Sequence, residues 1–162
     1  MKKLILVCGP AAIGKSTWSE AYAASHPEET VFIIAADEVR KDMFGGYKKF
    51  PPNGNMMVVY EEMIRRANAL WEQNEALTLL LDTTMLTDER RLFFLNRLAC
   101  FEYRALVLLK LHDYRLCLER NKQRPADKWV PEEVILDMAS HYYDPSPETA
   151  KRFNEVAEYY VD

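Results

Sequence analysis

Short, almost wholly apolar runs of residues alternate along this chain with segments in which apolar residues recur every three or four positions. The runs have the length of β-strands and lack the regular apolar–polar alternation of a strand with one solvated face. This pattern is typical of parallel strands that are buried on both faces. We expect such strands at residues 4–8, 31–35, 77–81 and 104–111. The tail at 153–161 fits a fifth strand or a last helical turn, and we favour the strand.

Helices are predicted between these strands. The clearest is 56–74, where apolar residues recur at helical spacing from Val59 to Leu70. Pro131 suits the first turn of a helix, where its missing N–H group is not needed. Segment 45–55 contains Gly-Gly, Pro-Pro and Asn-Gly pairs and is expected to be a loop. The expected helices are 15–24, 37–44, 56–74, 89–99, 114–122 and 131–142.

The alternation of strands and helices predicts an α/β fold, a three-layer α/β/α sandwich around a parallel sheet. A length of 162 residues suits one domain with one core of normal size, so we expect a single domain over 1–162. Sheets of this kind bind ligands beyond the carboxyl ends of their strands. Gly9, Asp37 and Asp82 each follow a predicted strand. We therefore expect these three residues at one edge of the sheet.

Residues 9–16, with the sequence GPAAIGKS, match the phosphate-binding pattern G-x-x-x-x-G-K-[ST] between a predicted strand and a predicted helix. Main-chain N–H groups and the positive end of the helix would surround the phosphates of a nucleotide. Lys15 would add a charge at the β- and γ-phosphates, and the Ser16 hydroxyl would ligate Mg²⁺. We expect ATP and Mg²⁺ as cofactors, with nucleotide contacts from Gly9, Ala12, Gly14, Lys15, Ser16, Thr17 and Arg120.

Three classes of protein use such loops: GTPase switches, ATPase motors and small kinases. Residues 121–124 begin like the guanine-reading element Asn-Lys-x-Asp, but Arg124 stands where its carboxylate belongs. Ring-forming motors usually need a longer chain. These points favour a P-loop NTPase fold of the nucleoside kinase type. A kinase also needs a carboxylate near the acceptor hydroxyl and arginines over the phosphates.

Two aspartates are candidates for that carboxylate. Asp37 precedes Arg40 by three residues, which places both side chains on one face of a helix. Asp37 would accept the proton of the acceptor hydroxyl while Arg40 binds a neighbouring anionic group; alternatively, Asp37 only caps the helix. Asp82 ends a strand, the usual place of a carboxylate near the metal. It would bind a water of Mg²⁺, hold Arg40 in place, or have no role at all.

The arginines are predicted on a lid at residues 120–131. Arg120 and Arg124 are four residues apart, so their side chains lie on one side of a helix. Their like charges repel each other there unless an anion lies between them. The following segment, rich in proline and charge, would close over the phosphates. The alternative is an ordinary solvated helix face.

Charge and composition limit the binding partners and the cellular location that we expect. The formal net charge of −4 excludes recruitment of nucleic acid by the overall field, so a polyanion would need a local basic patch. Cys8, Cys100 and Cys117 are too few for a disulfide framework and fit reduced thiols. No apolar stretch approaches the roughly 18 residues of a membrane span. We expect a cytoplasmic protein with no membrane segment.

Taken together, these motifs resemble those of the 5′-kinase domain of the bacteriophage-type polynucleotide kinases, over about residues 1–140. The resemblance implies that Asp37 is the general base for the 5′-hydroxyl. It also implies that Arg40 contacts a substrate phosphate and that Arg124 is a lid residue acting on the donor phosphates. The matching pieces are MKKLIL at 1–6, GKSTW at 14–18, Asp37-x-x-Arg40, Asp82-Thr83 with Glu89-Arg90-Arg91, and Arg120-Asn121-x-x-Arg124 before Val130-Pro131.

Three hypotheses for function follow. The first is an ATP-dependent kinase acting on the 5′-hydroxyl of a polynucleotide, with Lys15, Asp37 and Arg124 as catalytic residues. Residues 47–50 (YKKF) would then stack bases and meet the backbone, although the segment also fits an ordinary surface loop. The second is a small-metabolite kinase, favoured by the acidic net charge. The third is a non-catalytic ATP-binding module. The sequence indicates no oligomeric state.

Overall fold

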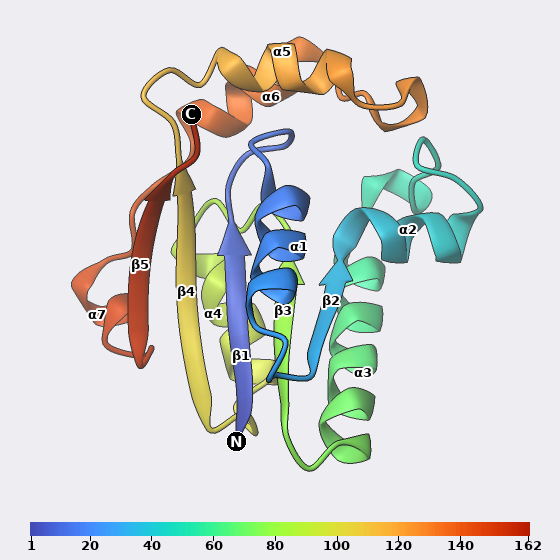
Figure 1. Ribbon diagram of the computed structural model, residues 1–162. Coiled ribbons are helices and arrows are strands. Elements are labelled where there is room, and N and C mark those ends of the chain that lie inside the picture. The colour runs from blue at the N-terminus through green and yellow to red at the C-terminus, as the bar shows by residue number, and fades with distance from the viewer.

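The computed structural model describes residues 1–162 and contains one sheet of five parallel strands in the order β2-β3-β1-β4-β5. All five strands point the same way (Figure 1). The four predicted strands are confirmed to within two residues, and the tail is a strand rather than a helical turn. The strands are β1 (Lys2–Cys8), β2 (Val31–Ala35), β3 (Leu77–Asp82), β4 (Tyr103–Lys110) and β5 (Glu155–Tyr160).

Helices connect the strands and cover both faces of the sheet, which confirms the three-layer α/β/α fold. Helix α1 lies on one face, whereas α3 and α4 lie on the other (Figure 1). The helices are α1 (Lys15–Ser25), α2 (Ala36–Phe44), α3 (Met57–Gln73), α4 (Asp88–Arg97), α5 (Leu116–Gln123), α6 (Glu132–Ser140) and α7 (Pro147–Ala150). Two 3₁₀ turns, at Pro52–Gly54 and Ala126–Lys128, lie in the segments predicted as loops.

Two details at helix starts differ from the prediction. Pro131 precedes α6 as its N-cap, with an extended backbone at ψ 139°, and so does not lie in the first turn. Helix α7 was not predicted, because four residues carry no periodic pattern. It is defined by its cap: the Ser146 hydroxyl accepts a hydrogen bond from the main-chain N–H of Thr149 at 3.2 Å.

Two apolar clusters form the core, one on each face of the sheet. Alternate residues of a strand point to opposite faces. In β1, Leu4 and Leu6 therefore pack with α3 and α4, whereas Ile5 and Val7 pack with α1, α5 and α6. Strands β1 and β3 carry fully buried residues along most of their length, as the unbroken apolar runs predict.

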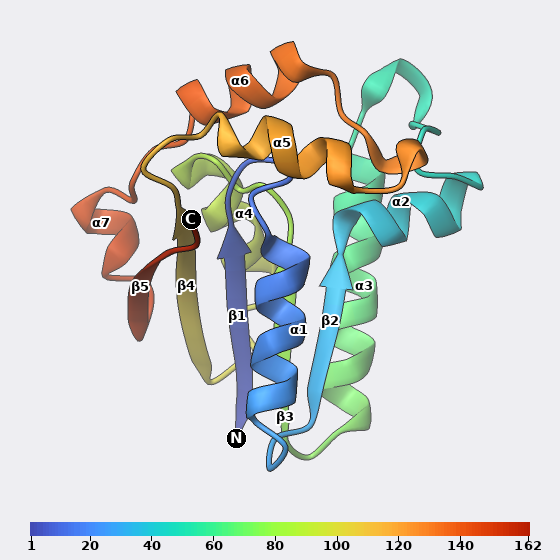
Figure 2. The ribbon, with the colours of Figure 1, turned by 45° about the horizontal axis from the view of Figure 1, so that its top comes forward.

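The carboxyl ends of the strands share one edge of the sheet. Helices α5 and α6 lie above this edge, next to the loop between β1 and α1, and α2 begins beside it (Figure 2). The fold thus places the predicted site residues at one end of the molecule. None of the helices combines the length and the apolar character that a bilayer crossing requires.

Candidate active site

The loop after β1 joins this strand to the first turn of α1. Gly14 is the N-cap of α1 and has a left-handed backbone, φ 115° and ψ 26°, which glycine adopts without a side-chain clash. At Gly9 there is no room for a side chain, because a Cβ atom there would lie 2.8 Å from the Ile13 side chain. The Gly9 N–H donates to the Thr84 carbonyl at 3.0 Å, which ties the loop to the end of β3. Both glycines of the motif are therefore required by the geometry.

Lys15 and Ser16 begin α1 at the mouth of this loop. The Lys15 ammonium folds back and donates to the carbonyls of Gly9 and Pro10, at 3.0 Å each. It is thereby held over the loop, where the β- and γ-phosphates of a nucleotide would lie. The Ser16 hydroxyl donates to Asp82 Oδ2 at 3.3 Å. A hydroxyl and a carboxylate side by side are the hard oxygen ligands that Mg²⁺ prefers, so these two residues fit a magnesium ion.

Asp82 is the electrostatic centre of the site. Its side chain is buried, with 6% of the residue exposed. Burial raises the pKa of the Asp82 carboxyl, and the negative charge of Asp37 adds to this; Lys15, the Ser16 hydrogen bond and Arg124 lower it. Charges from three segments of the chain thus act on one carboxylate. Of the alternatives for Asp82, the contact with Ser16 is present, whereas no hydrogen bond joins Asp82 to Arg40.

Asp37 lies in the first turn of α2, and its interpretation as a helix cap is wrong. The N-cap of α2 is Ala35, and no side chain caps this helix. The Asp37 side chain is 57% exposed and accepts one hydrogen bond, from Arg40 Nη1 at 3.2 Å. Its carboxylate is therefore accessible to a substrate while remaining close enough to influence Asp82.

Arg40 is buried beneath the loop that follows α2. Its Nε atom donates to the Lys49 carbonyl at 3.2 Å, and Nη2 donates to the Tyr47 carbonyl at 2.5 Å. The guanidinium also lies under the Phe50 ring, 4.2 Å from its centroid. Residues 47–50 are thus held in shape by Arg40. The predicted contact of Arg40 with a substrate phosphate stays a prediction, since its observed hydrogen bonds go to two loop carbonyls and to Asp37.

The two arginines of the predicted lid make hydrogen bonds within the protein. The alternative interpretation, an ordinary solvated helix face, is therefore wrong. Arg120 donates to the carbonyls of Ile13, at 2.8 Å, and Val161, at 2.5 Å, and so joins the phosphate loop to the end of β5. Arg124 donates through Nη2 to the Lys128 carbonyl, whereas its Nε atom is buried without a partner. Neither guanidinium is paired with a carboxylate, so both charges remain available to phosphate oxygens.

The segment after Arg124 crosses from α5 to α2 over the site (Figure 2). Lys128 forms an ion pair with Glu38 at 3.5 Å and lies 4.6 Å from the centre of the Tyr47 ring. The Tyr47 hydroxyl donates to the same Glu38 carboxylate at 2.5 Å. These contacts connect the predicted lid directly to α2 and to the loop that follows it.

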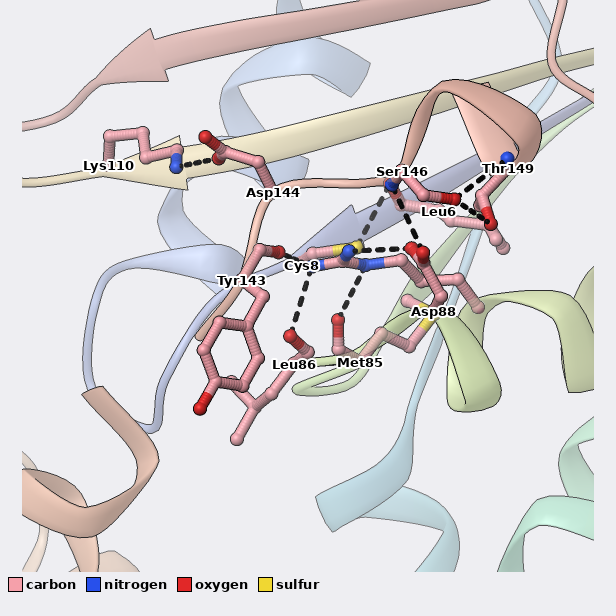
Figure 3. A network of polar contacts seen from close by, with 11 residues as sticks. Leu6, Cys8, Met85, Leu86, Asp88, Lys110, Tyr143, Asp144, Ser146 and Thr149 are labelled. Atoms are coloured by element: carbon pink, nitrogen blue, oxygen red, sulfur yellow. Dashed lines mark hydrogen bonds and ion pairs between the residues drawn. The ribbon is translucent and has the colours of Figure 1, made fainter. Parts of the chain in front are cut away.

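One buried arginine had no role in the sequence analysis beyond its place in the Glu89-Arg90-Arg91 motif. Arg91, with none of its surface exposed, donates to the carbonyls of Met85, Leu86 and Tyr143 at 3.0, 3.2 and 2.5 Å. It also pairs with Asp88 at 3.2 Å, and Figure 3 shows Met85, Leu86, Asp88 and Tyr143 gathered in one place. The motif is visible in the sequence, but nothing local marks the second arginine as buried.

This arginine network shapes the segment between β3 and α4. Met85 has a left-handed backbone, φ 41°, which is unusual for a residue with a side chain. The segment also contains Thr84, the partner of Gly9. Cys8 lies in the same network (Figure 3), and burial raises the pKa of its thiol to about 12, so the sulfur stays protonated. Arg91 and Cys8 are therefore structural supports of the site.

A groove of about 540 Å³ lies elsewhere, between α1 and strands β1, β4 and β5. Its walls include Trp18, Tyr22, Tyr103 and Tyr159. No predicted site residue lines this groove, and the phosphate loop opens at the far end of α1.

Comparisons with known proteins agree with this architecture. A family model described as an AAA domain matches residues 4–145. No curated protein matches the chain. Among solved structures, a gluconokinase from Sinorhizobium meliloti 1021 is similar, with a TM-score of 0.63 and 16% identity over 98% of this chain and 82% of that chain. Kti12 from Chaetomium thermophilum, in complex with ADP-AlF3, has a TM-score of 0.66 and 15% identity over 98% and 89%.

A chain in the Pnkp1/Rnl/Hen1 RNA repair complex has a TM-score of 0.73 and 15% identity, over 94% of this chain and 46% of that chain. The present chain thus spans less than half the length of that neighbour. A fungal RNA kinase has a TM-score of 0.66 and 13% identity, over 97% and 38%. At such low identities the likeness shows the fold alone.

Proposed function

Since the chain belongs to the AAA domain family and has a P-loop kinase fold, we propose that it transfers the γ-phosphoryl group of ATP to a hydroxyl. The observation that carries this proposal is the convergence of four charged side chains at one edge of the sheet. They are Lys15 and Asp37 at the starts of two helices, Asp82 at the end of a strand, and Arg124 at the base of the lid. The proposed acceptor is the 5′-hydroxyl of a polynucleotide.

The donor binds to residues 9–17 through main-chain N–H groups and the Lys15 ammonium. Mg²⁺ would be held by Ser16, with Asp82 next to it, and would neutralise charge on the phosphate oxygens. Arg124 supplies further positive charge from the lid, because its charge acts on Asp82 and its guanidinium has no carboxylate partner. Charge that develops on the transferring phosphoryl group is stabilised by Lys15 and Arg124.

Asp37 orients the acceptor and takes its proton. The hydroxyl oxygen forms a bond to the γ-phosphorus while the bond from that phosphorus to the β–γ bridging oxygen breaks. The proton of the hydroxyl passes to the Asp37 carboxylate, and ADP leaves with the electron pair of the broken bond. The exposure of Asp37 and its single hydrogen bond to Arg40 leave a carboxylate oxygen available for this role.

Two observations support a polynucleotide as acceptor. Residues 47–50 place aromatic rings and cations together beside α2, where stacked bases and phosphates would both find partners. Two similar solved structures are described as an RNA repair complex and an RNA kinase. A small-metabolite acceptor is the second candidate, favoured by the net charge of −4 and by the similar gluconokinase. A non-catalytic ATP-binding module is the third.

Transfer of radiolabel tests the proposal directly. The protein is incubated with Mg²⁺, γ-labelled ATP and either a 5′-hydroxyl oligonucleotide or a panel of metabolites that includes gluconate. We expect label on the oligonucleotide and none on the same oligonucleotide with a 5′-phosphate. The KM for the oligonucleotide should also rise steeply with salt, because several phosphates are contacted. Label on a metabolite alone would contradict the proposed acceptor, and ATP binding without acceptor-dependent ADP release would contradict catalysis.

A further inference from the structure

The peptide group between Cys8 and Gly9 is the point where β1 ends and the phosphate loop begins. Both of its polar atoms are held by distant segments. The Gly9 N–H donates to the Thr84 carbonyl at 3.0 Å, and the Cys8 carbonyl accepts a hydrogen bond from the Tyr142 hydroxyl at 3.2 Å. A peptide group is planar, so bonds to its N–H and to its C=O together fix its rotation about the chain. Tyr142 and Thr84 therefore determine how the first peptide of the loop is oriented.

The orientation of this peptide affects the cation of the phosphate loop. The next carbonyl along the chain is that of Gly9, and it accepts a hydrogen bond from the Lys15 ammonium at 3.0 Å. Rotation of the peptide before Gly9 would shift this carbonyl and the loop that follows it. The contact between Tyr142 and Cys8 thus lies two bonded residues away from the group that holds Lys15 in place.

The Tyr142 side chain is well suited to hold a carbonyl in one position. Burial raises the pKa of its phenol, so the hydroxyl keeps its proton and remains a donor. The same hydroxyl donates to the Leu109 carbonyl at 2.9 Å, which places it between the ends of β1 and β4. The ring packs edge-on against Tyr114, with centroids 6.2 Å apart and planes at 89°, and lies 5.1 Å from the Lys110 ammonium. These contacts restrict the position of the hydroxyl.

Tyr142 also lies at the base of the predicted lid at 120–131. It follows the end of α6 by two residues, and Tyr114 precedes the start of α5 by two residues. Both helices lie above the phosphate loop (Figure 2), and the two tyrosines pack together where the helices leave the sheet. The main-chain carbonyl of the next residue, Tyr143, accepts a hydrogen bond from Arg91 at 2.5 Å. The base of the lid is therefore fixed, and it includes the contact with Cys8.

We infer that Tyr142 is a positioning residue for the phosphate loop, with its hydroxyl orienting the peptide between Cys8 and Gly9 so that the loop and Lys15 are ready to bind phosphates. The inference rests on the proposed function, because it assigns to the loop the binding of ATP. Tyr142 acts through the main chain of β1. Phenylalanine at this position would fill nearly the same space but would leave the Cys8 carbonyl without this donor.

A positioning role differs from a purely structural one in a measurable way. A hydrogen bond that only stabilises the fold would lower the free energy of unfolding of the variant and leave the nucleotide affinity of the folded protein unchanged. A bond that orients the loop would change this affinity in the folded protein. It would also act on the donor nucleotide alone, because the contact lies at the phosphate loop.

Equilibrium binding tests the inference without requiring turnover. The full chain is titrated calorimetrically with a non-hydrolysable ATP analogue in the presence of Mg²⁺. We expect Tyr142→Phe to raise the Kd of the analogue by ~3–10-fold, the effect of one hydrogen bond between neutral groups. The matched control is Tyr143→Phe, at the neighbouring tyrosine, whose side chain is exposed and whose hydroxyl makes no hydrogen bond within the protein. This variant should keep the natural Kd.

Steady-state kinetics gives a second readout. In Tyr142→Phe the KM for ATP should rise, whereas the KM for the acceptor should stay unchanged. An unchanged Kd in Tyr142→Phe, an equal loss in Tyr143→Phe, or a rise in the KM of the acceptor alone would overturn the inference. Circular dichroism at the temperature of the titration checks that each variant is folded, and urea unfolding measures its stability separately.

The radiolabel transfer assay distinguishes this inference from the proposed function. If an acceptor is labelled but Tyr142→Phe binds the analogue as the natural protein does, only the inference fails. If no acceptor is labelled but the Kd of the analogue depends on the Tyr142 hydroxyl, only the proposed transfer fails. A natural protein that does not bind the analogue would contradict both.

Discussion

The phosphate loop and the acceptor side lie at the same edge of the sheet, but they are built in different ways. The loop is one stretch, residues 9–17, which we propose to bind phosphates mainly through its main-chain N–H groups. The proposed acceptor side combines Asp37 of α2, residues 47–50 of the loop after it, and Lys128 of the lid. In the proposed function, backbone geometry that one motif specifies recognises the triphosphate tail, whereas side chains that only packing brings together recognise the acceptor. Substitutions in the loop should affect every reaction, and those on the acceptor side should change which hydroxyl reacts.

The two halves are joined by hydrogen bonds and ion pairs within the protein. Arg91 shapes the segment whose Thr84 carbonyl holds Gly9, and Arg120 bonds to the Ile13 carbonyl within the loop. On the other side, Lys128 of the lid pairs with Glu38 of α2. The end of the molecule that holds the site therefore has three parts: a contiguous donor loop, a proposed acceptor side assembled from several elements, and the contacts that hold the two in position.

The largest effect is expected from the removal of Arg91, which holds the segment between β3 and α4 in position. Arg91→Leu leaves Asp88 without its cation and three carbonyls without a donor, so we expect a loss of about 3–5 kcal/mol in the free energy of unfolding. Urea unfolding followed by circular dichroism measures it. Arg97→Leu, at an exposed ion pair, is the matched control and should cost less than about 1 kcal/mol. Equal costs for the two variants would show that the buried network is not a support.

Lys15→Ala tests the donor half. Removing the ammonium leaves the charge on the transferring phosphoryl group unmatched, so kcat should fall at least ~100-fold with every acceptor that the enzyme uses. Steady-state ADP release measures this. Lys122→Ala, an exposed lysine paired with Glu132 on the lid helix, serves as control and should leave kcat unchanged. A loss for one acceptor only would contradict the assignment of Lys15 to the donor half.

Asp37→Asn tests the acceptor half. An amide cannot take the proton of the hydroxyl, so kcat should fall at least ~100-fold while binding of the ATP analogue is retained. Acceptor-dependent ADP release and calorimetry provide the two readouts. Asp42→Asn, on the same helix and paired with Arg66, should behave as the natural protein. Weakened nucleotide binding in the Asp37 variant would mean that the two halves are not separable in this way.

The smallest effect is expected at the contact between the lid and α2. Lys128 and Glu38 are partly exposed, and such pairs contribute little in water. Lys128→Ala should therefore lower kcat/KM by less than ~5-fold, with a smaller effect at high salt because the ion pair is already screened. Rates measured at two ionic strengths test this. A loss as large as that of Asp37→Asn would assign Lys128 to the chemistry instead of to closure.

Much of the fold could be predicted because the sheet is buried on both faces. Unbroken apolar runs mark β1 to β4, and the glycine-lysine motif marks the loop together with the strand and the helix that flank it. Prediction failed where local signals were short or ambiguous. Helix α7 has only four residues, Pro131 turned out to precede its helix, and Asp37 resembles a cap although no side chain caps α2.

The sequence by itself determined the class of chemistry, because the phosphate loop is a contiguous motif whose function lies in its backbone. Only the tertiary structure decided which arginines are buried, which are paired with a carboxylate and which are unpaired. Arg40 and Arg91 became buried supports, Arg97 was neutralised by a glutamate, and Arg90 was left unpaired on two aromatic rings. The charge of a guanidinium is the same wherever it occurs in a chain. Whether that charge supports the fold or remains free to bind a ligand depends on which groups, distant in sequence, are packed against it.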